Sequence, residues 1–142
     1  MREILFRGKA INRDKGYHRT NYKNGDWVYG LITRLYDERF ENLPAEMTDK
    51  GVSGIEVDYK TIGQYTGLTD KNGKKIFEGD IINIEYPDTI VRNAFVDYIG
   101  ASFRGDNGLD LWELDGYISL EVIGNIHDNP ELLEVTNNEN HS

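Results

Sequence analysis

The chain has 142 residues, of which 38% are hydrophobic and 29% are charged, with a formal net charge of −9 and no cysteine. This length suits one compact domain with a modest core, and the composition excludes a fully disordered chain. The lack of cysteine excludes disulfides, thiolate nucleophiles and sulfur-bound zinc.

Charge is distributed unevenly along the sequence. Residues 1–25 contain seven Lys and Arg against two Asp and Glu, a net of +5, whereas the other 117 residues contain nine against 23, a net of −14. A basic N-terminal segment therefore precedes an acidic body, and the two either attract each other or contact different partners.

No window of the sequence resembles a membrane span or a signal peptide. A span needs roughly 18 uninterrupted apolar residues, and residues 1–6 reach charged side chains too early for a signal sequence. We therefore expect a cytoplasmic protein that does not enter a membrane.

Short runs of β-branched and aromatic residues, separated by turn residues, make up the first half of the chain. The pair Asn24-Gly25 predicts a tight turn. Residues 34–54 are polar and contain proline and glycine, which predicts a loop or a variable insertion. The expected strands of this half are Ile4–Phe6, Asp26–Thr33, Gly54–Tyr59 and Ile62–Tyr65.

The second half continues in the same way. Asn72-Gly73 predicts a hairpin, and Glu78-Gly79-Asp80 predicts a second turn. Residues 117–126 are the most apolar run, which predicts a central strand, and a short helical turn is expected at 130–133. Residues 136–142 are expected to form a disordered tail. The expected strands of this half are Ile81–Tyr86, Ile90–Tyr98, Leu109–Leu114 and Tyr117–Ile126.

Short strands that recur about every ten residues, joined by Gly, Asn, Asp and Pro, are typical of antiparallel architectures and not of βαβ units. We therefore predict an all-β, β-dominated fold of antiparallel strands, with a single domain over residues 1–135.

Three segments of the sequence resemble the YopX family, a group of small proteins encoded by bacteriophages and prophages. The opening Met1–Arg7 is similar to the family's Arg-Glu-Ile-x-Phe-Arg. Residues 62–81 resemble its signature, in which Gln-Tyr-Thr-Gly-Leu runs into Glu-Gly-Asp-Ile, and residues 122–133 resemble its closing Gly-Asn-Ile and Asn-Pro-Glu-Leu-Leu. The order and spacing of the three segments also agree with the family.

The resemblance implies a small SH3-like barrel with an N-terminal β extension and a short C-terminal turn, in a phage-encoded protein of unassigned activity. It brings no catalytic residue to any position of this chain. Residues 34–54 and 87–116 match no fixed pattern of the family.

The glycines and turn residues of these motifs have a structural explanation. The four glycines of the motifs are expected where the backbone needs a positive φ or approaches another segment closely, and Asp80 and Asn125 are expected to cap turns. A ligand-binding surface beside the 78–80 turn is the alternative. The motif residues are Gly67, Gly73, Glu78, Gly79, Asp80, Gly124 and Asn125.

The sequence indicates no metal site, cofactor or catalytic group. Its three histidines, His18, His127 and His141, are far apart, and no nucleophile elbow or phosphate-binding loop is present. Carboxylate pairs such as Glu78 with Asp80, or Asp110 with Glu113, are expected by chance among 25 acidic residues. We therefore expect a protein that is not an enzyme.

Basic and aromatic residues alternate in the N-terminal segment, a mixture that suits phosphate contacts and base stacking. The acidic body would repel a polyanion, so nucleic-acid binding is the second hypothesis. The residues of this predicted binding surface are Arg7, Lys9, Arg13, Lys15, Tyr17, Arg19, Tyr22 and Lys23.

The first hypothesis is a protein-interaction module that binds a host or phage protein through complementary charge, with homo-oligomerisation as one form of it. Exposed aromatic residues would anchor such a contact, although core packing explains most of them equally well. The candidates are Tyr29, Tyr36, Tyr65, Tyr86, Tyr98 and Trp112.

Overall fold

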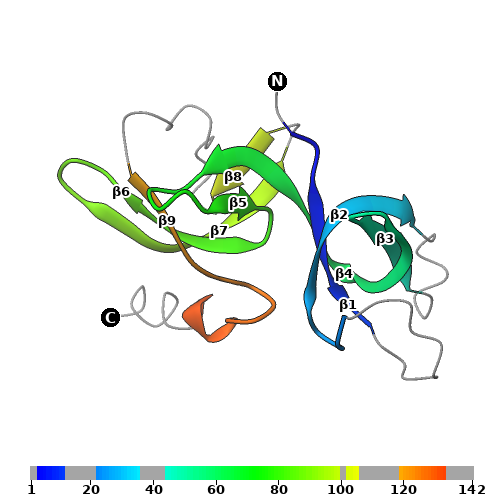
Figure 1. Ribbon diagram of the computed structural model, residues 1–142. Helices are drawn as coiled ribbons and strands as arrows, with labels where there is room; N and C mark the ends of the chain where they lie inside the picture. The colour runs from blue at the N-terminus through cyan, green and yellow to red at the C-terminus, as the bar shows by residue number, and fades with distance from the viewer. Residues whose placement is uncertain (1–2, 12–21, 36–43, 100–101, 106–118, 134–142) are drawn as a thin grey trace. The chain divides into compact units, whose positions relative to one another are not determined.

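The computed structural model describes residues 3–11, 22–35, 44–99, 102–105 and 119–133, and the structural statements below concern these residues (Figure 1). They form strands and one helical turn at residues 131–133, which confirms the all-β prediction. The strands are β1 Phe6–Ala10, β2 Trp27–Arg34, β3 Ala45–Asp49, β4 Val52–Thr69, β5 Lys75–Phe77, β6 Asp80–Glu85, β7 Ile90–Ile99, β8 Ser102–Gly105 and β9 Ser119–Asn125.

The chain divides into two compact units, residues 1–64 and 65–142, and the long strand β4 passes through the boundary. The prediction of a single domain over residues 1–135 stays a prediction. The two units also differ in net charge. Residues 1–64 contain 11 Lys and Arg against 10 Asp and Glu, a net of +1, whereas residues 65–142 contain 5 against 15, a net of −10.

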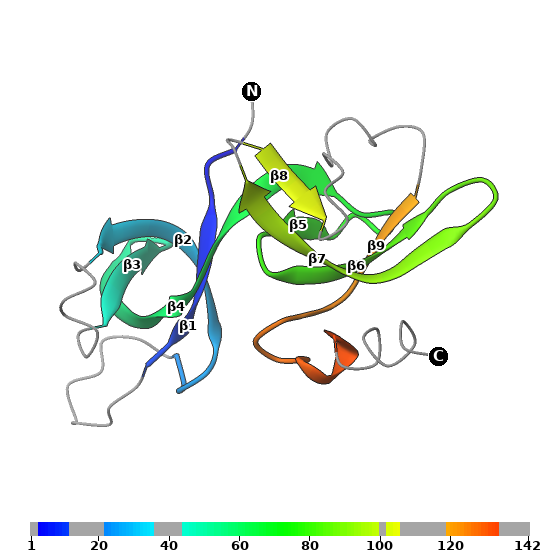
Figure 2. The same cartoon turned by 180° about the vertical axis from the view of Figure 1, so that it is seen from behind.

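The first unit is a closed ring of antiparallel strands. β1 pairs with β2, β2 with β3, β3 with β4, and β4 pairs again with β1. Both views of the ribbon show this ring (Figures 1 and 2). Its interior is filled by alternate residues of the strands, namely Ala10, Val28, Ala45, Met47, Ile55 and Val57.

Two glycines allow the strands of the ring to approach. A Cβ on Gly8 would lie 3.2 Å from the sulfur of Met47, so this position faces the crowded interior. A Cβ on Gly30 of β2 would overlap the backbone carbonyl oxygen of Thr48 on β3. Because a backbone atom of a paired strand cannot move aside, only glycine fits at position 30.

The second unit contains the β4–β5 hairpin and a four-stranded antiparallel sheet in the order β8-β7-β6-β9. In the hairpin, Tyr65 pairs with Phe77, and the turn between the strands has Gly73 at a φ of 80°. The hydrophobic core of this unit consists of Leu68, Ile76, Ile82, Ile84, Ala94, Val96 and Leu120.

The loop predicted at residues 34–54 is wrong over much of its length. Residues 45–49 form β3, and β4 begins at Val52. A two-residue turn, Lys50-Gly51, joins the strands with φ values of 49° and 83°. β3 was not predicted because its other residues are polar and only Ala45 and Met47 of this strand are buried. The two strands predicted at 54–59 and 62–65 form the single strand β4.

Two further predictions about the strands need correction. Residues 119–125 form β9, which lies at one end of the sheet order of the described strands and is not central. The most buried strand of that sheet is β6, whose apolar residues are covered on both faces. β1 is not an extension but a member of the ring. The predicted strand at 109–114 and the predicted tail at 136–142 fall outside the described residues.

The fold class is thus confirmed as all-β with two antiparallel sheets, whereas the SH3-like barrel stays a prediction. The predicted C-terminal turn is present, since Leu132 and Leu133 donate backbone hydrogen bonds to the carbonyls of Asn129 and Pro130, each at 3.1 Å. In the part of the chain that the structure describes, no helix has the length and apolar character needed to cross a membrane.

Candidate functional site

The structure describes four of the eight residues predicted to form a basic binding surface. Arg7 is buried, with 4% of its surface exposed, Lys9 and Tyr22 are half-buried, and Lys23 is exposed. The other four residues, Arg13, Lys15, Tyr17 and Arg19, lie outside the described residues.

Arg7 and Lys9 belong to the outward side of β1, next to β2. The Arg7 guanidinium lies 4.6 Å from the centre of the Trp27 ring, and the Lys9 ammonium lies 5.4 Å from it. The strand register explains this contact, because Lys9 pairs directly with Trp27 and Arg7 with Tyr29. Arg7 therefore packs against an indole and exposes little surface to a phosphate, and its membership of a binding surface stays a prediction.

Tyr22 is also engaged within the first unit. Its hydroxyl donates a hydrogen bond to the Asp49 carboxylate at the end of β3. Burial and this hydrogen bond raise the pKa of the Tyr22 hydroxyl to about 12. Tyr22 thus connects the segment before β2 to the β3–β4 hairpin. Its aromatic side chain packs against the hydrophobic core of the first unit.

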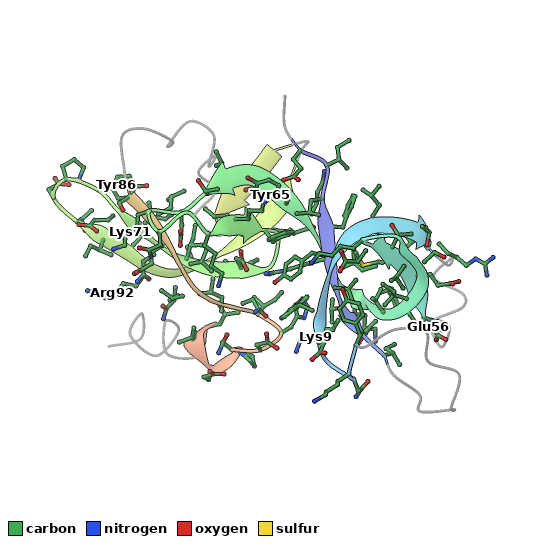
Figure 3. The ribbon with its side chains drawn as sticks, viewed as in Figure 1. Lys9, Glu56, Tyr65, Lys71, Tyr86 and Arg92 are labelled. Atoms are coloured by element: carbon green, nitrogen blue, oxygen red, sulfur yellow. The ribbon has the colours of Figure 1, made fainter. Side chains whose placement is uncertain are left out.

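The outward face of β2 carries a row of large apolar side chains. Val28 is buried in the core of the ring, so Trp27, Tyr29 and Leu31 face the other way. Trp27 is half-buried, while Tyr29 is 43% exposed and Leu31 is 50% exposed. We call these three residues the β2 row. Lys9, labelled in Figure 3, flanks the row from β1.

Four of the five exposed large hydrophobic residues of the described chain belong to the first unit, and two of these four are members of the β2 row. Ile4, Tyr29, Leu31 and Leu35 belong to the first unit, and Ile90 belongs to the second. Because single exposed apolar residues are common and adjacent ones on a rigid strand are less so, the β2 row is the strongest candidate for a binding surface.

The other aromatic residues proposed as anchors differ in their exposure. Tyr65 is buried and packs at 5.6 Å against the ring of Phe77, and Tyr86 packs partly against the core of the second unit. The side chain of Tyr98, and both Tyr36 and Trp112, lie outside the described part of the structure. The sequence analysis did not identify Trp27 and Leu31 as candidates. The predicted strand at residues 26–33 has apolar residues on both faces, and this pattern could have indicated that one apolar face is exposed.

Asp70 has a structural role in the second unit. Its carboxylate accepts backbone N–H groups of Asn72, Lys74 and Val122, each at 2.9 Å. Burial by itself raises the pKa of the Asp70 carboxyl, but the three N–H donors and the Lys74 charge outweigh it, so the pKa lies below its usual value. Both carboxylate oxygens therefore accept backbone N–H groups and hold the chain in place.

The turn that contains Asp70 also forms hydrogen bonds with β9, at the edge of that strand that does not pair with β6. The Lys71 N–H donates to the Leu120 carbonyl at 2.9 Å, beside the bond from Val122 to Asp70. The Lys71 ammonium, labelled in Figure 3, lies 3.7 Å from the Glu121 carboxylate. These contacts occupy backbone groups that an edge strand otherwise leaves open to other chains.

The Glu78-Gly79-Asp80 turn and the 124–129 segment meet in space. Asp80, which is 1% exposed, accepts the Phe77 N–H at 2.7 Å, and Gly79 has a φ of 91°. The Ile126 N–H donates to the Gly79 carbonyl at 2.9 Å, and Asp80 pairs with Asn125 across the strands.

Asn125 caps the turn that follows β9. Its side-chain oxygen accepts the N–H groups of His127 and Asp128 at 3.0 and 2.9 Å. A Cβ on Gly124 would lie 2.6 Å from the Asn129 side-chain oxygen, which itself accepts the Asn125 N–H. The 78–80 turn and the 124–129 segment, which belong to two of the family motifs, are therefore bonded to each other within the second unit. The described contacts give them structural roles, and the ligand-binding alternative stays untested.

A shallow depression lies at the tip of the β6–β7 hairpin, where the Tyr86 N–H donates to the Thr89 carbonyl at 2.8 Å. Tyr86 and Arg92, which line it, are labelled in Figure 3. All of its lining residues come from one hairpin, and none of these described residues is buried. No group of three or more potential metal ligands occurs among the described residues.

Comparison with known proteins identified a family and similarity to solved structures. No curated protein matches the sequence. The crystal structure of protein EF1440 from Enterococcus faecalis is similar, with a TM-score of 0.52 and 25% sequence identity, over 94% of this chain and 99% of that one. The family model described as YopX protein matches residues 21–134. That range includes β2 to β9 and the two signature segments at residues 62–81 and 122–133, and the chain therefore belongs to the YopX family.

Proposed function

We propose that this YopX-family chain is a non-catalytic protein-interaction module, encoded by a phage or prophage and active in the cytoplasm of the bacterial host, that binds its partner through the β2 row. The observation that carries the proposal is the exposure of Tyr29 and Leu31, at 43% and 50%, side by side on a strand paired at both edges. Large side chains held on a rigid strand lose little conformational entropy on binding, so they suit an interface.

Asp80, one of the carboxylates considered for acid–base chemistry, has a structural partner, and so does Asp70, which was not among them. Asp110 and Glu113 lie outside the described residues. Asp80 is buried and accepts the Phe77 N–H, and Asp70 accepts backbone N–H groups through both of its oxygens. Groups held in this way are used by the fold, which supports a role in binding over one in catalysis.

The proposal includes the finer fold prediction. The closure of the first unit through the β1–β4 pairing supports a small SH3-like barrel. Small barrels leave their outward side chains available while the interior remains filled, as Met47 and Val57 fill this one.

Affinity capture from lysates of host cells, with and without phage infection, tests the interaction module. The full chain is compared with the Tyr29→Ser/Leu31→Ser double variant and with Ile90→Ser, a control in the second unit with the same 43% exposure as Tyr29. Proteins that bind the wild type and Ile90→Ser but not the double variant support the proposal. Identical capture by all three chains overturns it.

Nucleic-acid binding through the basic N-terminal segment is the second candidate. The half-buried Lys9 beside Trp27 and the exposed Lys23 favour it, whereas the burial of Arg7 and the net charge of −10 in the second unit oppose it. Anisotropy titrations with single- and double-stranded oligonucleotides at ~50 mM and at high salt test this candidate. An absence of binding at low salt rejects it.

A further inference from the structure

Three asparagines of the sequence precede a glycine, and Asn-Gly is the pair that most readily loses its side-chain amide in water. They are Asn24, Asn72 and Asn107, of which Asn107 lies outside the described residues. Asparagine is chemically labile, and glycine favours the reaction because it has no Cβ to shield its backbone nitrogen. Asn24 and Asn72 are both exposed, and a Cβ on the glycine after either would meet no atom within 4 Å. Exposure does not distinguish the two sites, so their hydrogen bonds decide which of them reacts.

Deamidation begins when the backbone nitrogen of the glycine attacks Cγ, the side-chain carbonyl carbon of the asparagine. The glycine N–H loses its proton to hydroxide or water, the new N–Cγ bond closes a cyclic imide, and the Cγ–Nδ2 bond breaks, so that ammonia leaves. Water then opens the imide. Cleavage of the N–Cγ bond gives aspartate, and cleavage of the bond from nitrogen to the backbone carbonyl carbon gives isoaspartate. A glycine N–H that donates a hydrogen bond is shielded from base, so each site must first open.

At Asn72, the bonds that must open belong to one short turn. The Gly73 N–H donates to the backbone carbonyl of Asp70 at 2.9 Å, and the Asn72 N–H donates to the Asp70 carboxylate at 2.9 Å. The Lys74 N–H donates to the same carboxylate oxygen, also at 2.9 Å. Because Asp70 supplies every one of these acceptors, a local opening of the turn at this residue exposes the Gly73 N–H to base.

At Asn24, the corresponding bond is part of the ring of strands. The Gly25 N–H donates to the Ala10 carbonyl at 2.8 Å, and the Ala10 N–H donates to the Asp26 carbonyl at 2.8 Å. Ala10 is a buried residue of β1 and belongs to the core of the first unit. The Gly25 N–H is therefore exposed only when β1 and the start of β2 separate. Such an opening costs more free energy than the opening of a turn, so Asn72 should react first.

We propose that Asn72 is a deamidation site of the folded chain, that it reacts faster than Asn24, and that the contacts of Asp70 within the turn control its rate. The reaction needs water and base and no other reactant. This inference is independent of the proposed function, because it concerns a modification of the second unit and not the β2 row.

The modification changes the charge and the backbone of the turn. The new carboxylate lies in the segment 71–75, which contains three of the five Lys and Arg of the second unit. Isoaspartate also adds one carbon to the backbone of the turn, next to the Lys71 N–H that donates to the Leu120 carbonyl of β9. We expect amide exchange at Lys71 to be faster in the isoaspartyl form than in the unmodified chain.

Asn24 and Asn72 are a matched pair within one chain, because a lysine precedes each of them. The full chain is incubated at neutral pH and physiological temperature, and peptide mass spectrometry measures the aspartate and isoaspartate formed at each site. The same chain unfolded in urea is the reference, since both sites lose their acceptors there. We expect folding to slow Asn24 about 10-fold more than it slows Asn72. The proposal is overturned if Asn24 reacts as fast as Asn72 in the folded chain, or if Asn72 stays intact while the unfolded chain is consumed.

Substitution of Asp70 tests its control of the rate. Asp70→Ala removes the carboxylate that accepts the Asn72 and Lys74 N–H groups, so deamidation at Asn72 should be about 10-fold faster and that at Asn24 unchanged. Asp70→Asn keeps one side-chain oxygen for the turn and should give a smaller increase. It replaces Asp70→Ala if circular dichroism shows that the alanine variant does not fold. Asp88→Asn, which removes an exposed carboxylate from another turn of the same unit, should change neither rate. Equal rates at Asn72 in the wild type and in the folded Asp70 variants refute the role of Asp70.

Discussion

Replacement of Asp70 should destabilise the second unit in a pH-dependent way. Asp70→Ala removes the acceptor of three backbone N–H groups, one of which belongs to a strand residue 52 positions away, Val122. A buried donor without a partner costs about 1–3 kcal/mol, and the two donors within the turn regain part of this from water. The expected loss in the free energy of unfolding is therefore about 3–5 kcal/mol.

Asp70→Asn should be milder, because an amide keeps one oxygen for the turn but places an NH2 group or a poorer acceptor opposite the Val122 N–H. The expected loss is about 1.5–3 kcal/mol. The charge also determines the pH dependence. Since the pKa of Asp70 is lowered by folding, its contribution is fully present above the unfolded pKa near ~3.9 and is lost as pH falls through the folded value.

Urea unfolding followed between about pH 7 and pH 2 measures both effects, and amide exchange at Val122 reports the local contact. The wild type should lose more stability than Asp70→Asn as the pH falls below ~4, and exchange at Val122 should be faster in the variant. Asp88→Asn, which removes an exposed carboxylate from the β6–β7 hairpin, is the matched control. If Asp70→Asn gives the same stability and the same pH profile as the wild type, the structural role of this carboxylate is refuted.

Three further substitutions test other tertiary and turn contacts of the fold. Gly30→Ala should cost about 3 kcal/mol or more by thermal unfolding, because its Cβ would overlap the Thr48 carbonyl; a stability within ~0.5 kcal/mol of the wild type contradicts this. Tyr22→Phe should lower the free energy of unfolding by about 1–2 kcal/mol. In an ultraviolet titration, the wild-type Tyr22 hydroxyl, which is hydrogen-bonded to Asp49, should ionise near pH 12. Its contribution to stability should therefore decrease as the pH rises from ~10 toward that value. Asn125→Ala should cost about 1–3 kcal/mol in urea unfolding; unchanged amide exchange just after β9 would argue against the cap.

The sequence predicted the local features that depend on a few neighbouring residues. Glycine after asparagine or glutamate marked turns at Gly25, Gly73 and Gly79, and each has a positive φ. Asp80 and Asn125 were expected to cap turns, and their side chains accept backbone N–H groups within three residues. Each of these features is determined by local φ preference or by a side chain that reaches its own turn.

The candidate site was predicted only in part. Tyr29 was identified among six aromatic residues, whereas the membership of Trp27 and Leu31 depended on knowing which face of β2 meets the core. The basic segment was recognised as a charge pattern, but charge counting did not reveal that Arg7 lies against Trp27. A side chain's exposure depends on the strand next to it, and the register of that strand is not written in the local sequence.

Sequence alone thus determined the all-β class, the tight turns and membership of the YopX family, because alternation, turn chemistry and motifs act over short distances. The tertiary structure decided the closure of β1 onto β4, the continuity of β4 through two predicted strands, and the bond from Asp70 to Val122. The closure and the bond join residues about 50 positions apart. Which distant strand pairs with which depends on the packing of the whole unit, since any edge with a matching pleat offers the same backbone hydrogen bonds.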